Sequence, residues 1–148
     1  MGRDFLAFWR LDTLDAALRA GKALDYAASN QYARVQPGDT VWVVSVRGGR
    51  LRLVGRVAVD QVVDHDTAAQ AVGSAGLWQA HRYILPPAGT ARPVADIDIH
   101  HLVPDLQFEG SSDRLTPDED GLVSGQQLQA MRRLAGDSPR LLAEALGQ

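Results

Sequence analysis

Arginines are concentrated in one short stretch of this chain, where their chemistry suits contacts with phosphate groups or bases. Residues 34 to 56 hold five arginines against a single acidic residue, Asp39. The arginines are Arg34, Arg47, Arg50, Arg52 and Arg56. The guanidinium group is planar and always charged, and its forked donors match the oxygens of a phosphate. Two alternatives stay open: a general compositional preference for arginine over lysine, and a strand face that is simply solvated.

Clusters of histidine and aspartate raise the possibility of a metal site. The candidate ligands are His100 and His101 with Asp96, Asp98 and Asp105, and His65 between Asp64 and Asp66. Such side chains ligate zinc and other metals. Adjacent residues of a strand point to opposite faces, however, so His100 and His101 do not both reach one ion without a bulge. We predict no metal site.

The sequence lacks the motifs of several enzyme classes. It has no cysteine, which excludes disulfides, thiol nucleophiles and cysteine-ligated zinc. It has no Gly-x-Ser-x-Gly elbow of a serine hydrolase. The glycine-containing residues 72–76 include no lysine and follow no convincing strand, unlike a phosphate-binding loop. We expect no catalytic residues and no cofactor.

Length and composition are those of a globular protein. The 148 residues are 45% hydrophobic and 22% charged, so we predict a single domain, residues 1–148, with a sizeable core. No run approaches the roughly 20 apolar residues of a membrane span, and no signal peptide is evident, so we expect a cytoplasmic protein without a membrane partner. The net charge of -3 argues against binding nucleic acid by bulk electrostatics alone.

The arginine-rich stretch is predicted to be a β-hairpin. Pro37, Gly38 and Asp39 form a turn, a strand runs from Thr40 to Val46, and Gly48-Gly49 supplies the positive φ angles of a tight hairpin turn. In the second strand, alternation places the apolar side chains on one face and the arginines on the other. The apolar set is Leu51, Leu53, Val57 and Val59, and the opposite set is Arg52, Val54 and Arg56. Gly55 marks a bend, a bulge or the close approach of another backbone.

The flanking segments complete an α+β pattern. We predict a first strand over Phe5–Leu11, then a helix capped by Asp12 or Thr13 that ends at Gly21. Two helices are predicted to pack on the sheet at the end of the chain, over residues 124–136 and 138–147. This order favours a mostly antiparallel, curled sheet with flanking helices.

These segments together resemble a known family. An apolar first strand ending in an aromatic residue, a helix, a polar-aromatic loop, the Pro-Gly-Asp turn, a Val-Trp-rich strand and a Gly-containing strand are similar to the PUA-like barrels. The resemblance is closest to the EVE group, which is related to YTH and ASCH domains. It also extends to the EVE-like modules joined to HNH nucleases in bacterial modification-dependent restriction.

The resemblance implies a PUA-like β-barrel that accepts a flipped, modified base in an aromatic-lined pocket. Matched residue by residue, the base-binding positions are Trp9, Tyr26, Ser29, Asn30, Gln31 and Trp42. The five arginines become candidates for phosphate binding. The aromatic residues lack the tight spacing of a cage, and no HNH segment follows, so the resemblance does not imply nuclease activity for this chain.

Each of these residues also has a structural interpretation. A tryptophan in an apolar strand is commonly a core residue, which applies to Trp42 and to Trp9. Tyr26 can pack with its hydroxyl in water, and residues 29–31 can cap a loop. Stacking on an aromatic side chain is worth about 1–3 kcal/mol per base, enough for two such contacts to offset the extrusion of a base.

The resulting hypothesis is a reader of a modified base, with modified cytosine such as 5-methylcytosine in DNA as the expected ligand. The role would be restriction or phage defence, with a nuclease effector acting in trans. The alternatives are an ASCH-like ribonuclease and a protein-interaction module that binds no nucleic acid. Lys22, the only lysine, sits at a predicted helix end, which argues against the ribonuclease.

Overall fold

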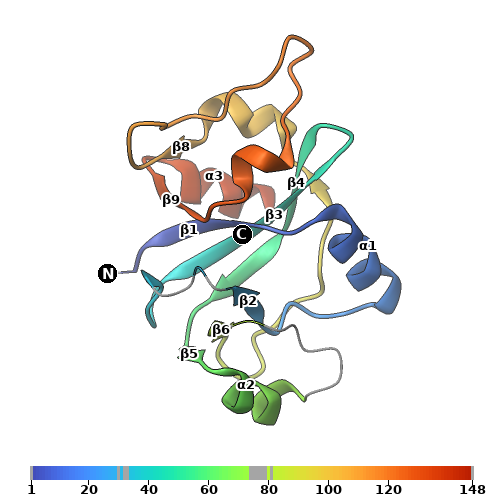
Figure 1. The fold of residues 1–148 in the computed structure, drawn as a ribbon, viewed down its shortest axis with the longest axis vertical. Coiled ribbons are helices and arrows are strands. Elements are labelled where there is room, and N and C mark those ends of the chain that lie inside the picture. Colours follow the sequence, from blue (N-terminus) through green and yellow to red (C-terminus); the bar gives the residue numbers. More distant parts are fainter. Residues whose placement is uncertain (1, 30, 32–33, 74–79, 81, 148) are drawn as a thin grey trace.

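The computed structural model describes residues 2–29, 31, 34–73, 80 and 82–147, which form a mixed α+β fold (Figure 1). The strands are β1 (Asp4–Phe8), β2 (Ala27–Ser29), β3 (Thr40–Arg47), β4 (Arg50–Ala58), β5 (Gln61–Val63), β6 (Arg82–Leu85), β7 (Ile97–Asp98), β8 (Gln107–Phe108) and β9 (Arg132–Ala135). The helices are α1 (Leu11–Ala20), α2 (His65–Val72) and α3 (Ser138–Ala145), with the 3₁₀ helices η2 (His100–Asp105) and η3 (Gly125–Leu128). Among the described residues, no helix has the length and apolar character needed to cross a membrane.

A six-stranded mixed sheet forms the centre of the molecule. Its order is β7-β4-β3-β1-β9-β8, and a separate three-stranded sheet has the order β2-β6-β5. β1 lies parallel to β3, with α1 as the crossover between them, and antiparallel to β9. The expected α+β class with flanking helices is confirmed, but within the described residues the strands form two sheets rather than one closed barrel.

The hairpin of β3 and β4 has the turn that its glycines predicted. Gly48 and Gly49 take φ angles of 59° and 78°, as two residues of this kind of tight turn require. Before β3, the predicted turn also forms, because the backbone N–H of Asp39 donates to the carbonyl of Gln36 at 3.0 Å. The buried Asp39 carboxylate accepts the backbone N–H groups of Arg3 and Gln36 at 2.9 and 2.8 Å. This carboxylate therefore ties the start of β1 to the turn before β3.

A bulge in β4 changes which side chains share a face. Val43 pairs with Gly55 but Val44 pairs with Leu53, which leaves Val54 as the extra residue. Strand alternation reverses at such a bulge. Leu51 and Leu53 face one core cluster, while Val57 and Val59 face the other. Gly55 is thus confirmed as a special position, and the prediction that Leu51, Leu53, Val57 and Val59 share one face is wrong.

The hydrophobic core lies on both faces of the central sheet. One cluster joins the sheet to α3, the two 3₁₀ helices and β8 and β9, on the upper side in Figure 1. The other includes side chains from α1, β2 and β6 and continues toward the second sheet and α2. Leu6 of β1 packs in the first cluster and Phe5 in the second, so neighbouring residues of one strand connect the two.

The end of the chain differs from its prediction. The helix expected over residues 124–136 is instead η3 followed by β9, and only the second predicted helix is present, as α3. β9 pairs with the edge of β1 through Arg132 and Arg133, and with β8 through Leu134 and Ala135. Backbone pairing on both sides outweighs the local helical periodicity, because tertiary context overrides propensity.

Candidate functional site

An aromatic cavity opens where the end of β1, the helix α1 and the segment before β2 meet. Its volume is about 330 Å³. The residues that line it are Phe8, Trp9, Arg10, Thr13, Ala16, Ala17, Lys22, Ala23, Asp25, Tyr26, Ala27, Ala28 and Val94. Trp9 and Tyr26, two of the predicted base-binding residues, therefore line the same cavity. We refer to it as the Trp9–Tyr26 cavity.

Two hydrogen bonds to β3 hold the backbone of Trp9 just after the end of β1. The N–H of Trp9 donates to the carbonyl of Val44 at 2.8 Å, which extends the pairing of β1 with β3 by one residue. The buried Ser45 hydroxyl then donates to the carbonyl of Trp9 at 2.8 Å. The helix α1 begins two residues later, at Leu11. Both the N–H and the carbonyl of Trp9 are therefore hydrogen-bonded to β3, and this backbone carries the half-buried indole.

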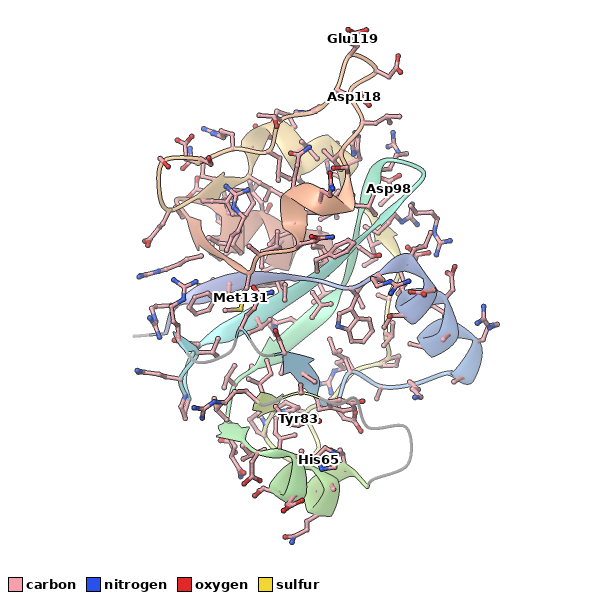
Figure 2. The ribbon with its side chains drawn as sticks, viewed as in Figure 1. His65, Tyr83, Asp98, Asp118, Glu119 and Met131 are labelled. Carbon is pink, nitrogen blue, oxygen red and sulfur yellow. The ribbon has the colours of Figure 1, made fainter. Side chains whose placement is uncertain are left out.

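The buried Tyr83 packs against Tyr26. Its ring centroid lies 6.2 Å from that of Tyr83, with the rings tilted by 46°. Tyr83 is fully buried in β6, and His65 of α2 meets it edge-on at 5.7 Å (Figure 2). The second sheet and α2 therefore pack behind one wall of the cavity through Tyr83 and His65.

The cavity also holds polar groups that the sequence analysis did not assign to the site. Thr13 of α1, Lys22 and Asp25 all line it. Lys22 follows Gly21, which ends α1 with φ 62°, and the carbonyl of Lys22 accepts the N–H of Val94 at 3.0 Å. Its place directly after α1 brings Lys22 to the cavity. One feature of the sequence could have indicated a role for Lys22: it is the only lysine in an arginine-rich chain.

Ser29 and Gln31 lie at a smaller adjoining cavity of about 60 Å³, which shares Phe8, Trp9 and Ala28 with the larger one. Their side chains are engaged within the protein. The Ser29 hydroxyl accepts the N–H of Gln31 at 2.9 Å. The Gln31 amide donates to the carbonyl of Gln129 at 3.0 Å and accepts the N–H of Met131 at 2.6 Å. Both residues border the site while tying this loop to the segment before β9, and Asn30 lies outside the described residues.

Trp42 is not brought to the cavity. It is 2% exposed and belongs to the core cluster on the other face of the sheet. Its indole N–H donates to the carboxylate of Asp4 at 3.0 Å, and the guanidinium of Arg56 lies over its ring at 5.5 Å. We therefore leave Trp42 out of the site. In β3, Trp42 points to one face of the sheet, whereas its neighbours Val41 and Val43 point to the face that carries the second core cluster.

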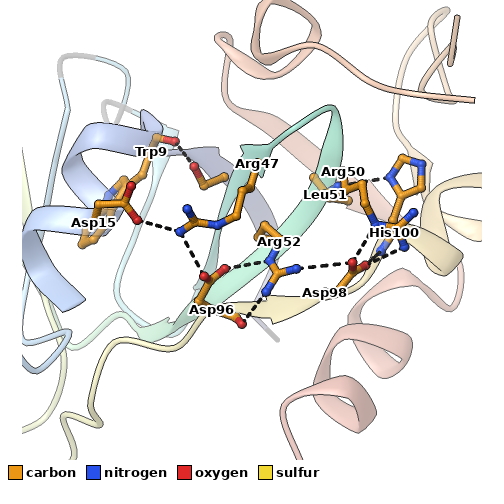
Figure 3. Close-up of polar contacts among 10 residues, drawn as sticks. Trp9, Asp15, Arg47, Arg50, Leu51, Arg52, Asp96, Asp98 and His100 are labelled. Carbon is orange, nitrogen blue, oxygen red and sulfur yellow. Dashed lines mark hydrogen bonds and ion pairs between the residues drawn. The ribbon is translucent and has the colours of Figure 1, made fainter. Parts of the chain in front are cut away.

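Three of the five arginines form an ion-pair network with aspartates (Figure 3). Arg47 bonds to Asp15 at 2.6 Å and to Asp96 at 3.0 Å. Arg52 bonds to Asp96 at 2.7 Å and lies 3.3 Å from an oxygen of Asp98. Their positive charge is therefore largely neutralised by acidic residues that come from α1 and from the segment of β7.

The third arginine, Arg50, completes this network at Asp98. Its guanidinium donates to the Asp98 carboxylate at 2.7 Å, and the backbone N–H of His100 donates to the same carboxylate at 2.9 Å. These hydrogen bonds lower the pKa of Asp98 from 3.8 to about 2. The side-chain hydrogen bond from Arg47 likewise lowers the pKa of Asp15 below its ordinary value.

Arg34 and Arg56 stand apart from this network. Arg34 is exposed and its guanidinium lies 5.9 Å from the ring of Phe5. Within the described residues, neither Arg34 nor Arg56 has a carboxylate at ion-pair distance. The bulge at Val54 places Arg56 on the opposite face of β4 from Arg52, so the predicted common arginine face is wrong for this pair.

The histidines considered as metal ligands have other contacts. The Nδ1 of His100 accepts the N–H of Leu51 at 3.1 Å and its Nε2 lies 2.7 Å from the carbonyl of Gly121. His65 packs on Tyr83, as described above. Within the part of the chain that the structure describes, no group of three or more metal-ligating side chains is assembled.

Comparison with known proteins identifies the fold. No protein-family model matches the sequence, and no curated protein matches it. Among solved structures, the chain is similar to the crystal structure of a mutant of the ASCH protein of Zymomonas mobilis, with a TM-score of 0.52 and 12% sequence identity over 96% of this chain and 95% of that one. The likeness confirms the expected α+β fold class. The likeness does not single out the EVE group.

Proposed function

We propose that this ASCH-like, PUA-like domain binds nucleic acid and takes one base into the Trp9–Tyr26 cavity. The observation that carries the proposal is the meeting of two aromatic side chains, one after β1 and one before β2, on one cavity that is also lined by residues with hydrogen-bonding groups. Its volume of about 330 Å³ lies at the lower end of the range for small-molecule pockets, roughly 300–1,000 Å³. Such a cavity suits one planar ring system.

The lining supports a pyrimidine with an amino group. The Asp25 carboxylate is an acceptor of the kind that pairs with the exocyclic amine of cytosine, and Thr13 and Lys22 add donors for ring oxygens or nitrogens. Much of the remaining wall is made of alanines and Val94, which leave an apolar surface for a methyl substituent. Stacking on Trp9 or Tyr26 would contribute about 1–3 kcal/mol for each aromatic contact.

The finer proposal is therefore recognition of modified cytosine in DNA, as in an EVE-type reader, with cleavage left to an effector nuclease in trans. Ser29 and Gln31 would hold the loop beside the site rather than read the base, since they line the adjoining cavity and their hydrogen bonds are made within the protein. This assignment predicts binding without chemical change to the oligonucleotide.

The test is a binding series with labelled oligonucleotides of one sequence at fixed moderate salt. The series contains unmodified DNA, DNA with 5-methylcytosine, 5-hydroxymethylcytosine or N6-methyladenine, and the matching RNA. We expect at least a tenfold preference for one ligand, about 1.4 kcal/mol. Trp9→Ala and Tyr26→Ala should each abolish the preference, because each removes one stacking surface.

Trp9→Phe and Tyr26→Phe are the matched controls, since each keeps an aromatic ring. They should retain most of the preference, and their circular dichroism should match that of the wild type. Equal affinity for all oligonucleotides, unchanged by Trp9→Ala, would reject the base-binding cavity and favour the protein-interaction module.

The second candidate is RNA cleavage, the ASCH-like alternative. It is favoured by the place of Lys22 and Asp25 on the cavity, because a cation and a carboxylate at one site are suited to proton transfer and charge stabilisation. Incubation of the purified protein with single-stranded RNA would show cleavage that Lys22→Met abolishes. Intact RNA under conditions where the oligonucleotide binds would remove this candidate.

A further inference from the structure

A second cavity, of about 590 Å³, adjoins the first and has a distinctly basic lining. β4 contributes Arg56 to it, and the segment after β6 contributes Thr90 and Arg92. The other residues that line it are apolar side chains or glycines, and no aspartate or glutamate is among them. We call this feature the Arg56–Arg92 cleft.

Arg56 of the cleft contacts the ring of Trp42, and no described carboxylate neutralises it. Its guanidinium lies 5.5 Å from the ring centroid of the buried Trp42, whose own N–H is bonded to Asp4. A cation over an indole face is attracted by the ring without losing its charge. Within the described residues no carboxylate lies at ion-pair distance from Arg56, in contrast to Arg47 of the same hairpin.

Among the described residues, Arg92 likewise bonds to backbone carbonyls and to no carboxylate. Its Nη1 donates to the carbonyls of Thr90 and Ala91 at 3.2 and 3.4 Å, both in its own loop. The backbone of this loop is fixed, because the carbonyl of Arg92 accepts the N–H of Leu24 at 2.8 Å. A guanidinium has five N–H donors, so most of those of Arg92 stay available to an anion.

The cleft and the Trp9–Tyr26 cavity share one wall. That wall is the bridge between Ala23 and Pro93, closed by the hydrogen bond from Val94 to Lys22 at 3.0 Å. Leu24 and Pro93 line the cleft, while Ala23 and Val94, their chain neighbours, line the aromatic cavity. The two sites are therefore separated by little more than one pair of backbone segments.

We propose that the Arg56–Arg92 cleft binds a phosphate group. This inference rests on the proposed function: the phosphate belongs to the nucleic-acid strand whose base occupies the Trp9–Tyr26 cavity. The two guanidiniums, which have no carboxylate partner among the described residues, supply charge-assisted hydrogen bonds to its oxygens. Phosphate contact is thus assigned to Arg56 and to Arg92. No sequence pattern indicated Arg92. The neutralised Arg47, Arg50 and Arg52 are not assigned a phosphate contact.

The salt dependence of oligonucleotide binding tests the proposal. Arg56→Gln and Arg92→Gln should each weaken binding about tenfold and reduce the slope of log K against log salt by about 0.7, the value for one contact with a single strand. Arg56→Lys should keep the slope. Arg114→Gln removes an exposed charge that lines neither cavity and should leave the affinity within twofold. Slopes for Arg56→Gln and Arg92→Gln that equal that of Arg114→Gln would overturn the phosphate site.

A second titration separates this proposal from the proposed function. Inorganic phosphate is added to ¹⁵N-labelled protein, and we expect amide shifts at residues 55–58 and 90–92 that are absent from the doubly substituted protein. Those shifts without oligonucleotide binding would reject the base reader and leave the cleft as a site for a free phosphate compound. Oligonucleotide binding that depends on Trp9 but not on Arg56 or Arg92, without phosphate shifts, would reject the cleft alone.

Discussion

At the scale of single residues, carboxylates decide which arginines are available for a ligand. Asp15, Asp96 and Asp98 come from two distant segments and engage Arg47, Arg50 and Arg52. Their effect is to turn a basic strand face into a neutral network that joins α1 and β7 to the hairpin. Arg56 escapes this network because the bulge in β4 turns it to the other face.

Asp98 gives this network a measurable pH dependence. Its pKa is lowered to about 2 from 3.8 by the hydrogen bonds from Arg50 and from the backbone of His100. A lowered pKa means that the contribution to stability is complete above the unfolded value and is lost as pH falls through the folded value. We expect Asp98→Asn to lower the free energy of unfolding by about 1 kcal/mol at pH 7, a modest figure because the carboxylate is partly exposed.

Urea titrations at pH 7 and at several values between pH 4 and pH 2 would measure this effect. The difference between wild type and Asp98→Asn should shrink across that interval. A difference that stays constant down to pH 2 would show that the ion pair does not account for the loss. Asp118→Asn serves as a control for charge alone, because the Asp118 side chain accepts the local backbone N–H groups of Asp120 and Leu122 near the tip of its loop and forms no ion pair within the described residues (Figure 2).

At the scale of the elements, the bulged strand β4 positions the wall between the two cavities. A Cβ atom added at Gly55 would lie 2.8 Å from the Cδ2 atom of Leu24, and Leu24 is 3% exposed. The absence of a side chain at Gly55 is thus what lets the segment after α1 approach the sheet. That segment carries Lys22, Asp25 and Tyr26 to the aromatic cavity.

Gly55→Ala should therefore destabilise the protein by about 1–3 kcal/mol through overpacking. The same substitution in a Leu24→Ala background should cost much less, because the clashing methyl group is gone. A double-mutant cycle followed by urea unfolding measures this coupling. Equal costs of Gly55→Ala in both backgrounds would instead indicate a purely backbone effect at the bulge.

The hairpin turn offers a second test at this scale. Gly48 has φ 59°, and a Cβ atom there would meet no heavy atom within 4 Å. The penalty for a side chain is therefore conformational rather than steric, about 1 kcal/mol for alanine in the left-handed region. We expect Gly48→Asn to cost clearly less than Gly48→Ala in thermal unfolding, since asparagine adopts this region more readily. Equal losses in the two variants would show that the turn does not depend on its positive φ.

At the scale of the whole molecule, the central sheet is shared by both core clusters. β1, β3 and β4 each contribute side chains to the cluster under α3 and to the cluster under α1. If either core cluster lost its packing, one face of β1, β3 and β4 would be exposed to water, and the same strands form part of the other cluster. This arrangement supports the proposal that residues 1–148 fold as one domain.

We expect a single cooperative unfolding transition in urea. Far-UV circular dichroism reports the helices and strands, and in a Trp78→Phe variant tryptophan fluorescence reports Trp42 in one cluster and Trp9 against the other. The two probes should give coincident midpoints, as two-state unfolding requires. Midpoints that differ beyond error would divide the molecule into two units and reject the single domain.

Local chemistry allowed several features to be predicted from sequence. The Pro-Gly-Asp turn, the double-glycine turn and the helix stop at Gly21 depend on residues whose backbone preferences are intrinsic. The apolar strand β1 and the α+β order follow from hydrophobic pattern in the same way, although β1 ends at Phe8 and the predicted strand residue Leu11 begins α1. The placing of Trp9 beside Tyr26 also came from sequence, but through a family resemblance rather than through residue chemistry.

Other features depended on contacts between distant segments, which no local pattern contains. The bulge in β4 reversed the alternation, pairing with β1 turned a helical pattern into β9, and aspartates from α1 and β7 neutralised the arginines. Burial likewise assigned Trp42 to the core. The sequence by itself determined the turns, the strand β1 and the chemical types at the site, because these follow from each residue and its neighbours. Only the tertiary structure decided which side chains share a face, a charge partner or a cavity, because those depend on residues far apart in the chain.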